Sequence, residues 1–452
     1  MPSTLQEPPR AVLVGVQLPH VSDVEHEADM AELGRLVHTL GFTVVGTVSQ
    51  KRPGLAAGSV LGEGKLKELA ALTGGTGEIP TGAPQRKSKA RDKWTEDEPE
   101  PVVPPPVEEG ARPPARATVV VVDHELSPSQ ARNLERATGA EVLDRTGVIV
   151  DIFHRHAKSR EARMQVEIAR LNYLVPRMRE SPSGRERQQG QGAGESALEL
   201  DRRKVRDRIA ELKDGLATIQ EDQDHRRHAR RDQLRVALVG YTNAGKSSLM
   251  RALTGSEVLV ADQLFATLDT TVRALQPETR PRILVSDTVG FIKKLPHDLV
   301  ASFRSTLDEA LEASLLLYVV DAADPTAQAQ LEVTRGVLRE IGAEVVPRLL
   351  LLNKADRLGP ERRAELLAQH PDAIVLSAHS PTDIAALRAR IVEHFERSMV
   401  EAELLIPYDK QRVVAQVYEN ARVLSEDFDE TGRRLVLRAL PAALAKLSRL
   451  VA

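Results

Sequence analysis

Two short segments of this chain carry residue types that can hold a nucleoside triphosphate. The first is Gly240-Tyr241-Thr242-Asn243-Ala244-Gly245-Lys246-Ser247, whose glycines, lysine and serine have the spacing of a phosphate-binding loop. Such a loop closes backbone N–H groups around a β-phosphate, and the helix that follows adds positive potential. Lys246 would reach the β- and γ-phosphates, and the Ser247 hydroxyl would complete a Mg²⁺ shell. This segment predicts a bound nucleoside triphosphate with magnesium.

The second segment, Asn353-Lys354-Ala355-Asp356, selects the base. A buried carboxylate at Asp356 can accept two hydrogen bonds, from N1–H and from the exocyclic amine of guanine. Adenine offers no such pair of donors. Binding of adenine would therefore leave the carboxylate without partners, and this cost in free energy would exclude adenine. Ser377-Ala378-His379 would support the base from the other side. A polar turn between a strand and a helix is the alternative, but the phosphate loop in the same chain favours guanine recognition.

Two further segments could report whether the γ-phosphate is present. In Asp287-Thr288-Val289-Gly290, the carboxylate can hold Mg²⁺ through water while the Gly290 N–H approaches the γ-phosphate. Residues 264–271 contain hydroxyl groups that can join the metal shell only while that phosphate is bound, which would make the segment an order–disorder switch. The residues alone do not decide among Thr267, Thr270 and Thr271.

The elements that must position these segments form an α/β pattern. Five apolar runs predict buried strands with helical patterns between them: residues 235–239, 283–286, 315–320, 349–352 and 374–376. This order is typical of a doubly wound nucleotide-binding domain, here residues 232–397. Residues 398–452 predict a small α+β domain with strands at 403–407 and 434–438 and a helix between them that extends to Val423.

Residues 1–153 predict a separate parallel α/β domain, with a helix that opens at Ser127-Pro128 and strands at 11–18, 42–45 and 118–122. Residues from about 74 to 116 interrupt this domain with Gly/Thr, charged and Pro-rich stretches. Because these stretches have no periodicity, we expect a disordered insertion.

Gly62-Glu63-Gly64-Lys65 could either open a helix or hold a phosphate. A helix start is the favoured interpretation.

Residues 154–231 predict a helical hairpin. Two apolar series with 4-3-4-3 spacing should pack as an antiparallel coiled coil: Met164, Ile168, Leu171, Val175 and Met178, and Val205, Ile209, Leu212, Leu216 and Ile219. Residues 155–231 contain 19 Lys or Arg against 13 Asp or Glu, although the whole chain has a net charge of -3. This local excess of positive charge could bind a polyanion, or it could belong to an ordinary solvated helix face. Charge alone favours the solvated face.

The composition excludes several classes of protein. The chain has no Cys, so it has no disulfide framework, no thiolate metal site and no cysteine nucleophile. The first ten residues lack the apolar core of a signal peptide, and no apolar run approaches the ~18 residues needed to cross a bilayer. We expect a soluble, cytoplasmic monomer of roughly two to four domains.

Together these segments resemble the HflX family of translation-associated GTPases over nearly the whole chain. Three further stretches carry the resemblance: Leu126-Ser127-Pro128-Ser129-Gln130, Asp144-Arg145-Thr146-Gly147-Val148-Ile149-Val150-Asp151-Ile152-Phe153, and Asp287-Thr288-Val289-Gly290-Phe291-Ile292 with Lys294-Leu295-Pro296 after it. The resemblance implies an N-terminal α/β domain, a helical hairpin, a Ras-like G domain and a small C-terminal domain.

The resemblance also implies functional residues and partners. It places nucleotide contacts on Phe265-Ala266-Thr267-Leu268-Asp269 and the Mg²⁺ ion on Ser247 and Thr267. It implies binding to the large ribosomal subunit or the 70S ribosome, in some members with subunit splitting under stress.

Phe291 stands where Ras-type proteins carry the glutamine that orients the attacking water. An apolar side chain cannot position water. We therefore assign no catalytic residue, and we expect slow intrinsic GTP hydrolysis that a partner stimulates.

Two features depart from the family pattern. In the hairpin loop, typical members have Arg-Gly-Pro-Gly-Glu-Thr, whereas Gln191-Gly192-Ala193-Gly194-Glu195-Ser196 keeps Gly194 and Glu195 but neither the Arg nor the Pro. The Pro-rich insertion is the second departure, so a diverged paralogue with another client is an alternative.

Three functional hypotheses follow from these patterns. The first is a GTP-hydrolysing switch that acts on the ribosome. The second is a GTP-dependent binding module for a non-ribosomal RNA or protein. The least favoured is an ATP-dependent RNA remodeller, which would have to accept adenine despite Asp356.

Overall fold

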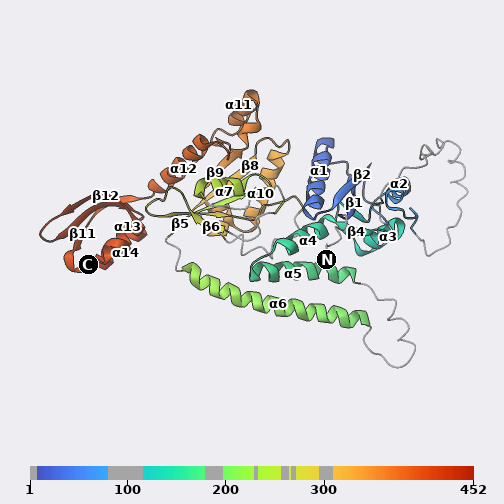
Figure 1. Cartoon of the computed structure of the whole chain (residues 1–452), viewed down its shortest axis with the longest axis horizontal. Coiled ribbons are helices and arrows are strands. Elements are labelled where there is room, and N and C mark those ends of the chain that lie inside the picture. Colours follow the sequence, from blue (N-terminus) through green and yellow to red (C-terminus); the bar gives the residue numbers. More distant parts are fainter. Residues whose placement is uncertain are drawn as a thin grey trace, which may run out of the picture. The chain divides into compact units, whose positions relative to one another are not determined.

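The structure is a computed structural model of the 452-residue chain, and it describes residues 8–56, 58–79, 116–178, 197–228, 233–255, 264–265, 271–294 and 309–451. Contacts divide the chain into two compact units, Met1–Ile149 and Val150–Ala452. Each unit combines helices with parallel strands, which confirms the predicted α/β fold class (Figure 1).

The N-terminal unit is built on a four-stranded parallel sheet. Its strands lie in the order β2 (Thr43–Lys51), β1 (Arg10–Gln17), β3 (Val119–Val122) and β4 (Glu141–Asp144). The helices of this unit are α1 (Asp23–Thr39), α2 (Glu63–Thr73), α3 (Pro128–Thr138) and the beginning of α4 (Arg145–His156). The three predicted strands are confirmed, whereas β4 was not predicted.

Two helix starts follow the local sequence rules. Ser127 caps α3 by accepting a hydrogen bond from the Gln130 N–H, and the Gln130 side chain accepts from the Ser127 N–H in return. Helix α2 begins directly after Gly62, which confirms the helix-start interpretation of Gly62-Glu63-Gly64-Lys65.

The ends of the predicted disordered insertion belong to the folded N-terminal unit. The Gly77 N–H donates to the Ala137 carbonyl (2.9 Å), the Ala117 N–H donates to Leu72 (3.0 Å), and Ile79 packs against the core. The prediction that disorder begins at residue 74 is therefore wrong, because these backbone groups find partners in α2 and α3. Residues 80–115 lie outside the described part of the chain.

The Asp144-Arg145 pair has a structural role at the end of β4. The Asp144 carboxylate accepts hydrogen bonds from the N–H groups of Leu126 (3.1 Å) and Gly147 (2.8 Å). The buried Arg145 guanidinium pairs with the carboxylates of Asp123 and Glu32, which are also buried. Removing either carboxylate would leave a less compensated charge in the core.

The predicted helical hairpin consists of α5 (Arg160–Leu174), the 3-10 turn η2 (Val175–Arg177) and α6 (Ala197–His228) (Figure 1). Arg208 on α6 pairs with Glu167 on α5, with 3.0 Å between Nε and Oε1. The predicted α6 seam is confirmed, because its five apolar residues are buried or half-buried while most neighbouring side chains are exposed.

Helix α5 differs from the predicted seam in two respects. Ala162, Val166 and Ala169 are buried alongside Ile168, so α5 is covered on more than one face. The α-helical part ends at Leu174 because Pro176 has no N–H to continue the hydrogen-bond ladder. Residues 179–196, which contain the atypical sequence predicted to form the hairpin loop, lie outside the described residues.

The second unit contains a six-stranded sheet. Its strand order is β10 (Ile374–Val375), β9 (Arg348–Asn353), β8 (Leu315–Asp321), β5 (Leu234–Gly240), β7 (Ile283–Asp287) and β6 (Thr271–Ala274). All neighbours are parallel except β6, which pairs antiparallel with β7 and was not predicted. The other elements are α7 (Lys246–Thr254), α10 (Ala327–Glu340), η4 (Ala343–Val345), η5 (Ala355–Arg357), α11 (Pro360–Gln369) and α12 (Pro381–Glu396).

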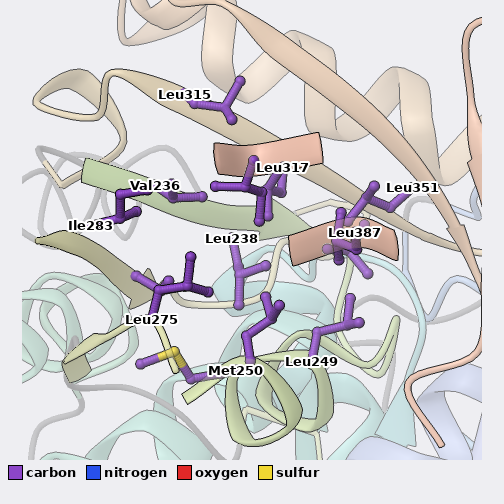
Figure 2. Close-up of a cluster of buried hydrophobic side chains, with 14 of the residues drawn as sticks. Val236, Leu238, Leu249, Met250, Leu275, Ile283, Leu315, Leu317, Leu351 and Leu387 are labelled. Carbon is purple, nitrogen blue, oxygen red and sulfur yellow. The ribbon is translucent and has the colours of Figure 1, made fainter. Parts of the chain in front are cut away.

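Alternate residues of the central strands serve two separate cores, one on each face of the sheet. Leu238 of β5 and Leu317 of β8 pack with Leu249 and Met250 of α7, as Figure 2 shows. The alternating neighbours Val239 and Tyr318 belong to the other cluster, which includes Leu331 and Leu338 of α10 and Leu366 of α11. The continuous apolar runs of these strands are therefore explained by burial on both faces.

The C-terminal part is a three-stranded antiparallel sheet with helices. The strand order is β11 (Val400–Pro407), β13 (Gly432–Ala439) and β12 (Ala421–Phe428), and the helices are η6 (Tyr408–Lys410), α13 (Val413–Asn420) and α14 (Pro441–Val451). Both predicted strands are confirmed. The helix predicted to reach Val423 ends at Asn420, because Val423 pairs with Leu437 in the sheet.

Candidate nucleotide site

The phosphate loop connects β5 to α7, the context that the sequence requires. Asn243 and Gly245 have φ angles of 60° and 96°, which turn the chain back before α7 begins. The buried Lys246 ammonium donates to the carbonyl groups of Gly240 (3.0 Å) and Tyr241 (2.8 Å). Burial lowers the pKa of Lys246 to about 8, and the nearby Asp287 carboxylate partly opposes this shift.

Asp287 lies beside the phosphate loop because β7 is the neighbour of β5. Its carboxylate is completely buried, and Oδ2 accepts a hydrogen bond from the Ser247 hydroxyl at 2.7 Å. The structure thus brings together two of the predicted magnesium-site residues. Oxygen donors of this kind suit Mg²⁺, which keeps several waters and needs few protein ligands. The third predicted residue, Thr267, lies outside the described residues.

The segment after Asp287 is hydrogen-bonded to the phosphate loop. The Thr242 N–H donates to the Phe291 carbonyl (2.7 Å), and the Phe291 N–H donates to the Gly240 carbonyl (3.1 Å). The Tyr241 hydroxyl also accepts from the Lys293 N–H at 2.7 Å. A movement of this segment that follows the γ-phosphate would therefore disturb the loop itself.

Glycine is required at Gly290 by close packing. A Cβ atom added there would lie 2.9 Å from the Lys246 Nζ and 2.9 Å from both Cα and Cγ2 of Thr242. The position next to it is different in kind. The Phe291 side chain is 2% exposed and packs with Val239 and Tyr318, in the cluster on the face opposite α7. Phe291 is therefore a core residue, and its side chain is directed away from the loop.

Asn353 joins the phosphate loop to the proposed base-binding segments. The buried side chain donates from Nδ2 to the Ala244 carbonyl (2.9 Å) and accepts at Oδ1 from the Ala378 N–H (3.1 Å). Nδ2 would lie 2.2 Å from a Cβ atom at position 245, so the close approach of Asn353 explains why Gly245 is a glycine.

Asp356 lies where a base could reach it. Its Oδ1 accepts a hydrogen bond from the Ser377 hydroxyl at 2.6 Å, which lowers the pKa of the carboxyl below its ordinary value. The side chain is exposed, so the expectation of a buried acceptor is wrong for the chain as it stands. Burial of this carboxylate would have to come from the base itself.

Two acidic residues that sequence reasoning missed hold these segments in place. Asp321, the last residue of β8, pairs with Lys354 at 2.7 Å, while Lys354 itself has a φ of 62°. Asp383 accepts from the Ser377 N–H at 2.8 Å, and the His379 N–H donates to the Ser377 hydroxyl at 3.2 Å. The position of Asp321 at the end of a predicted strand was a signal that could have identified it.

The predicted switch segment is described only at its beginning. Phe265 is 3% exposed and has a φ of 60°. Its ring lies 4.5 Å, centroid to centroid, from the ring of Phe153 on α4. Residues 266–270, which include Ala266, Thr267, Leu268 and Asp269, lie outside the described residues, so their predicted roles stay predictions.

These features define a P-loop GTPase, with a phosphate loop, an acidic residue and the predicted base-binding segment at the carboxyl ends of parallel strands. Three family models match the chain: "GTP-binding GTPase N-terminal" over residues 27–78 and 109–154, "GTP-binding GTPase Middle Region" over 156–230, and "50S ribosome-binding GTPase" over 235–354. The chain belongs to the GTPase HflX family, and it binds and hydrolyses GTP.

The relatives match the chain over almost its full length. A GTPase HflX from Gluconacetobacter diazotrophicus is 69% identical over 445 residues, which cover 98% of each chain. A GTPase HflX from Alkalihalophilus pseudofirmus is 36% identical over 433 residues, 94% of this chain and 92% of that one. A GTP-binding protein from Sulfolobus solfataricus, solved in complex with GDP, is 23% identical with a TM-score of 0.43, covering 85% of this chain and 98% of that one.

Within the described residues, no helix is both long enough and apolar enough to cross a bilayer.

Proposed function

We propose that this chain is a Mg²⁺-dependent GTP switch whose GTP-bound form associates with the large ribosomal subunit or the 70S ribosome. The observation that carries the proposal is the match of residues 235–354 to a ribosome-binding GTPase model, in a chain that also contains a basic hairpin. The hydrogen bonds that join Phe291 to Thr242 and to Gly240 support the switch, since they connect the phosphate loop to the segment that should respond to the γ-phosphate.

The nucleotide contacts follow from the donors and acceptors of the site. Lys246 uses two of its three N–H groups inside the loop, and the third would reach a phosphate oxygen. Ser247 and Thr267 would hold Mg²⁺, with Asp287 bound to the ion through water. The ion would neutralise charge on the β- and γ-phosphates. Asp356 would accept from N1–H and the amine of guanine, and Ser377-Ala378-His379 would support the base.

Hydrolysis by the isolated chain should be slow. The burial of Phe291 in the core supports this proposal, because its side chain takes no part in the phosphate site. A ribosomal partner would then accelerate hydrolysis.

The hairpin supports an rRNA partner. Arg203 and Arg206 on α6 are exposed, and such side chains can contact phosphate groups.

We also propose four domains, at residues 1–153, 154–231, 232–397 and 398–452.

Co-sedimentation with ribosomes tests the proposal. The full chain should pellet with 50S or 70S particles in the presence of Mg²⁺ and a non-hydrolysable GTP analogue, and should stay in the supernatant with GDP. Changing both Arg203 and Arg206 to Gln should reduce the slope of log K against log salt by about two if both contact phosphates. The exposed pair Arg362 and Arg390, changed to Gln, serves as the control and should leave the slope unchanged.

Two results would contradict the proposal. One is equal pelleting with GDP and with the analogue. The other is no pelleting under conditions in which the chain binds the analogue, which would favour a non-ribosomal RNA or protein partner. If pelleting is seen, gradient profiles of 70S particles would show whether the chain splits them into subunits.

A further inference from the structure

The Thr242 hydroxyl is the one feature of the phosphate loop that the folded chain does not explain. Thr242 is 6% exposed, and its Oγ1 is buried without a hydrogen-bond partner among the residues that the structure describes. A buried hydroxyl without a partner is unfavourable, and each such group in a folded protein calls for an explanation. Valine would fill the same volume without this penalty. The hydroxyl therefore indicates a ligand.

The neighbouring hydroxyl groups are all engaged. The Ser247 hydroxyl donates to Asp287, and the Thr288 hydroxyl donates to the Leu238 carbonyl at 2.6 Å. The Tyr241 hydroxyl accepts from Lys293. Of the hydroxyl groups in residues 240–247 and 287–290, all within the described chain, only that of Thr242 is without a partner.

Thr242 also lies next to Gly290 and Lys246, the residues proposed above to contact the γ-phosphate. Its backbone is fixed by the hydrogen bond from its N–H to the Phe291 carbonyl. A single point next to Gly290 lies 2.9 Å from the Lys246 Nζ and 2.9 Å from Cα and Cγ2 of Thr242. Lys246 and the Gly290 N–H are the two groups proposed above to face the γ-phosphate. The side-chain atom nearest to that point is the Thr242 methyl carbon, and the unpartnered hydroxyl is attached to the same Cβ atom.

We propose that Thr242 is a positioning residue for GTP hydrolysis, whose hydroxyl holds the attacking water at the γ-phosphate. A threonine hydroxyl can accept a hydrogen bond from the water and donate its own proton to a phosphate oxygen. In the reaction, the water oxygen bonds to the γ-phosphorus, and the bond from that phosphorus to the β–γ bridging oxygen breaks. The electron pair stays on GDP, and a proton of the water passes to the phosphate product. Thr242 thereby supplies the orientation that Phe291 cannot.

The test compares Thr242→Val, which removes only the hydroxyl, with Thr242→Ser, which keeps it. In single-turnover assays of the full chain with GTP, Mg²⁺ and no ribosomes, Thr242→Val should hydrolyse GTP at least about tenfold more slowly. Its Kd for GTP and for GDP should stay within about twofold of wild type, and Thr242→Ser should retain most of the rate. Thr334→Val is the matched control, because the buried Thr334 hydroxyl bonds only to the Gln330 carbonyl of its own helix.

A second measurement separates positioning from a structural role. Aluminium fluoride with GDP imitates the phosphate in the transition state, so Thr242→Val should lose affinity for that complex while keeping its affinity for GDP alone. Wild-type hydrolysis by Thr242→Val would overturn the proposal. So would an equal loss of GDP affinity and rate, or a Thr242→Ser variant as slow as Thr242→Val. Because ribosomes are absent, none of these results depends on the ribosomal partner.

Discussion

Lys246 carries its positive charge on a side chain that is only 6% exposed. Its pKa of about 8 reflects that burial, and the negative phosphates of a bound nucleotide must raise the pKa again. At pH values between the lower pKa of Lys246 in the free chain and its higher pKa in the complex, Lys246 takes up a proton when the nucleotide binds. Affinity is therefore highest when Lys246 is already protonated and falls as the pH rises above about 8.

This linkage predicts the pH dependence of nucleotide binding. The affinity for GTP should be level from pH 6.5 to 7.5 and should then fall by up to about tenfold per unit above pH 8. Equilibrium fluorescence titrations up to about pH 9 would measure it, below the range in which guanine itself ionises. Lys246→Arg, which cannot lose its proton there, should bind more weakly but with a flat profile. A flat profile for the wild-type chain would contradict the prediction.

Asp356 gives a second prediction for a single residue. Asp356→Asn replaces an acceptor with an NH₂ group that faces the amine of guanine, so the affinity for GTP should fall by at least about a hundredfold. Xanthine has an oxygen in place of that amine, and the variant should therefore prefer XTP to GTP. Competition with a labelled nucleotide would measure both affinities. The exposed Asp372, changed to Asn, is the control. Full guanine preference in Asp356→Asn would refute this role.

At the residue scale, the sequence predicts which side chains belong to the site better than it predicts their hydrogen-bond partners. The spacing of Gly240 to Ser247 was sufficient to predict the loop between β5 and α7, and Asp287 was placed correctly beside Ser247. The bonds from Asn353 to Ala244 and Ala378 join residues far apart in the chain. No local pattern contains that information, since it depends on the order of the strands in the sheet.

At the scale of elements, the segment from Asp287 to Lys293 is anchored on both sides. Its backbone is bonded to the phosphate loop, while the Phe291 ring lies in the core shared with α10 and α11. The anchor explains why the position normally occupied by a catalytic glutamine can be apolar. The ring stabilises the fold of the segment and leaves the placement of water to other groups.

This anchoring predicts the outcome of restoring the glutamine. Phe291→Gln should lower the free energy of unfolding by about 2–4 kcal/mol, because it removes buried apolar contacts and buries an amide. It should not hydrolyse GTP faster than wild type. Chemical denaturation and single-turnover hydrolysis would measure the two effects. Phe428→Gln, at a side chain that is 63% exposed, should leave the stability nearly unchanged. A faster Phe291→Gln variant of normal stability would show that the ring is not an anchor.

Strand prediction succeeded where the apolar pattern was continuous and failed where polar or charged residues interrupted it. The runs that became β5 and β8 are apolar throughout because both of their faces are covered. By contrast, β4 (EVLD) and β6 (TVRA) contain polar or charged residues, whereas β3, which is equally short, is four valines and was predicted. In β12, the register shifts between Val423 and Ser425, which breaks the alternation of apolar and polar residues. That irregularity explains why Val423 was assigned to a helix.

For the whole molecule, the fold class and the family could be predicted, and the two relatives described above match 98% and 94% of the chain. The limits of the insertion could not. Gly77 looks like part of a low-complexity stretch, yet its N–H group donates to the Ala137 carbonyl. Backbone hydrogen bonds of this kind depend little on side-chain identity, so composition does not reveal them.

The two hydrogen bonds of Asn353 have a consequence for timing. Hydrolysis removes the γ-phosphate, but neither the bond to Ala244 nor the bond to Ala378 involves that group. The product GDP would therefore stay bound through its base and its two remaining phosphates. The interval before the chain can begin another cycle would then be governed by how long GDP stays bound, and a factor that loosened Asn353 would act as an exchange catalyst.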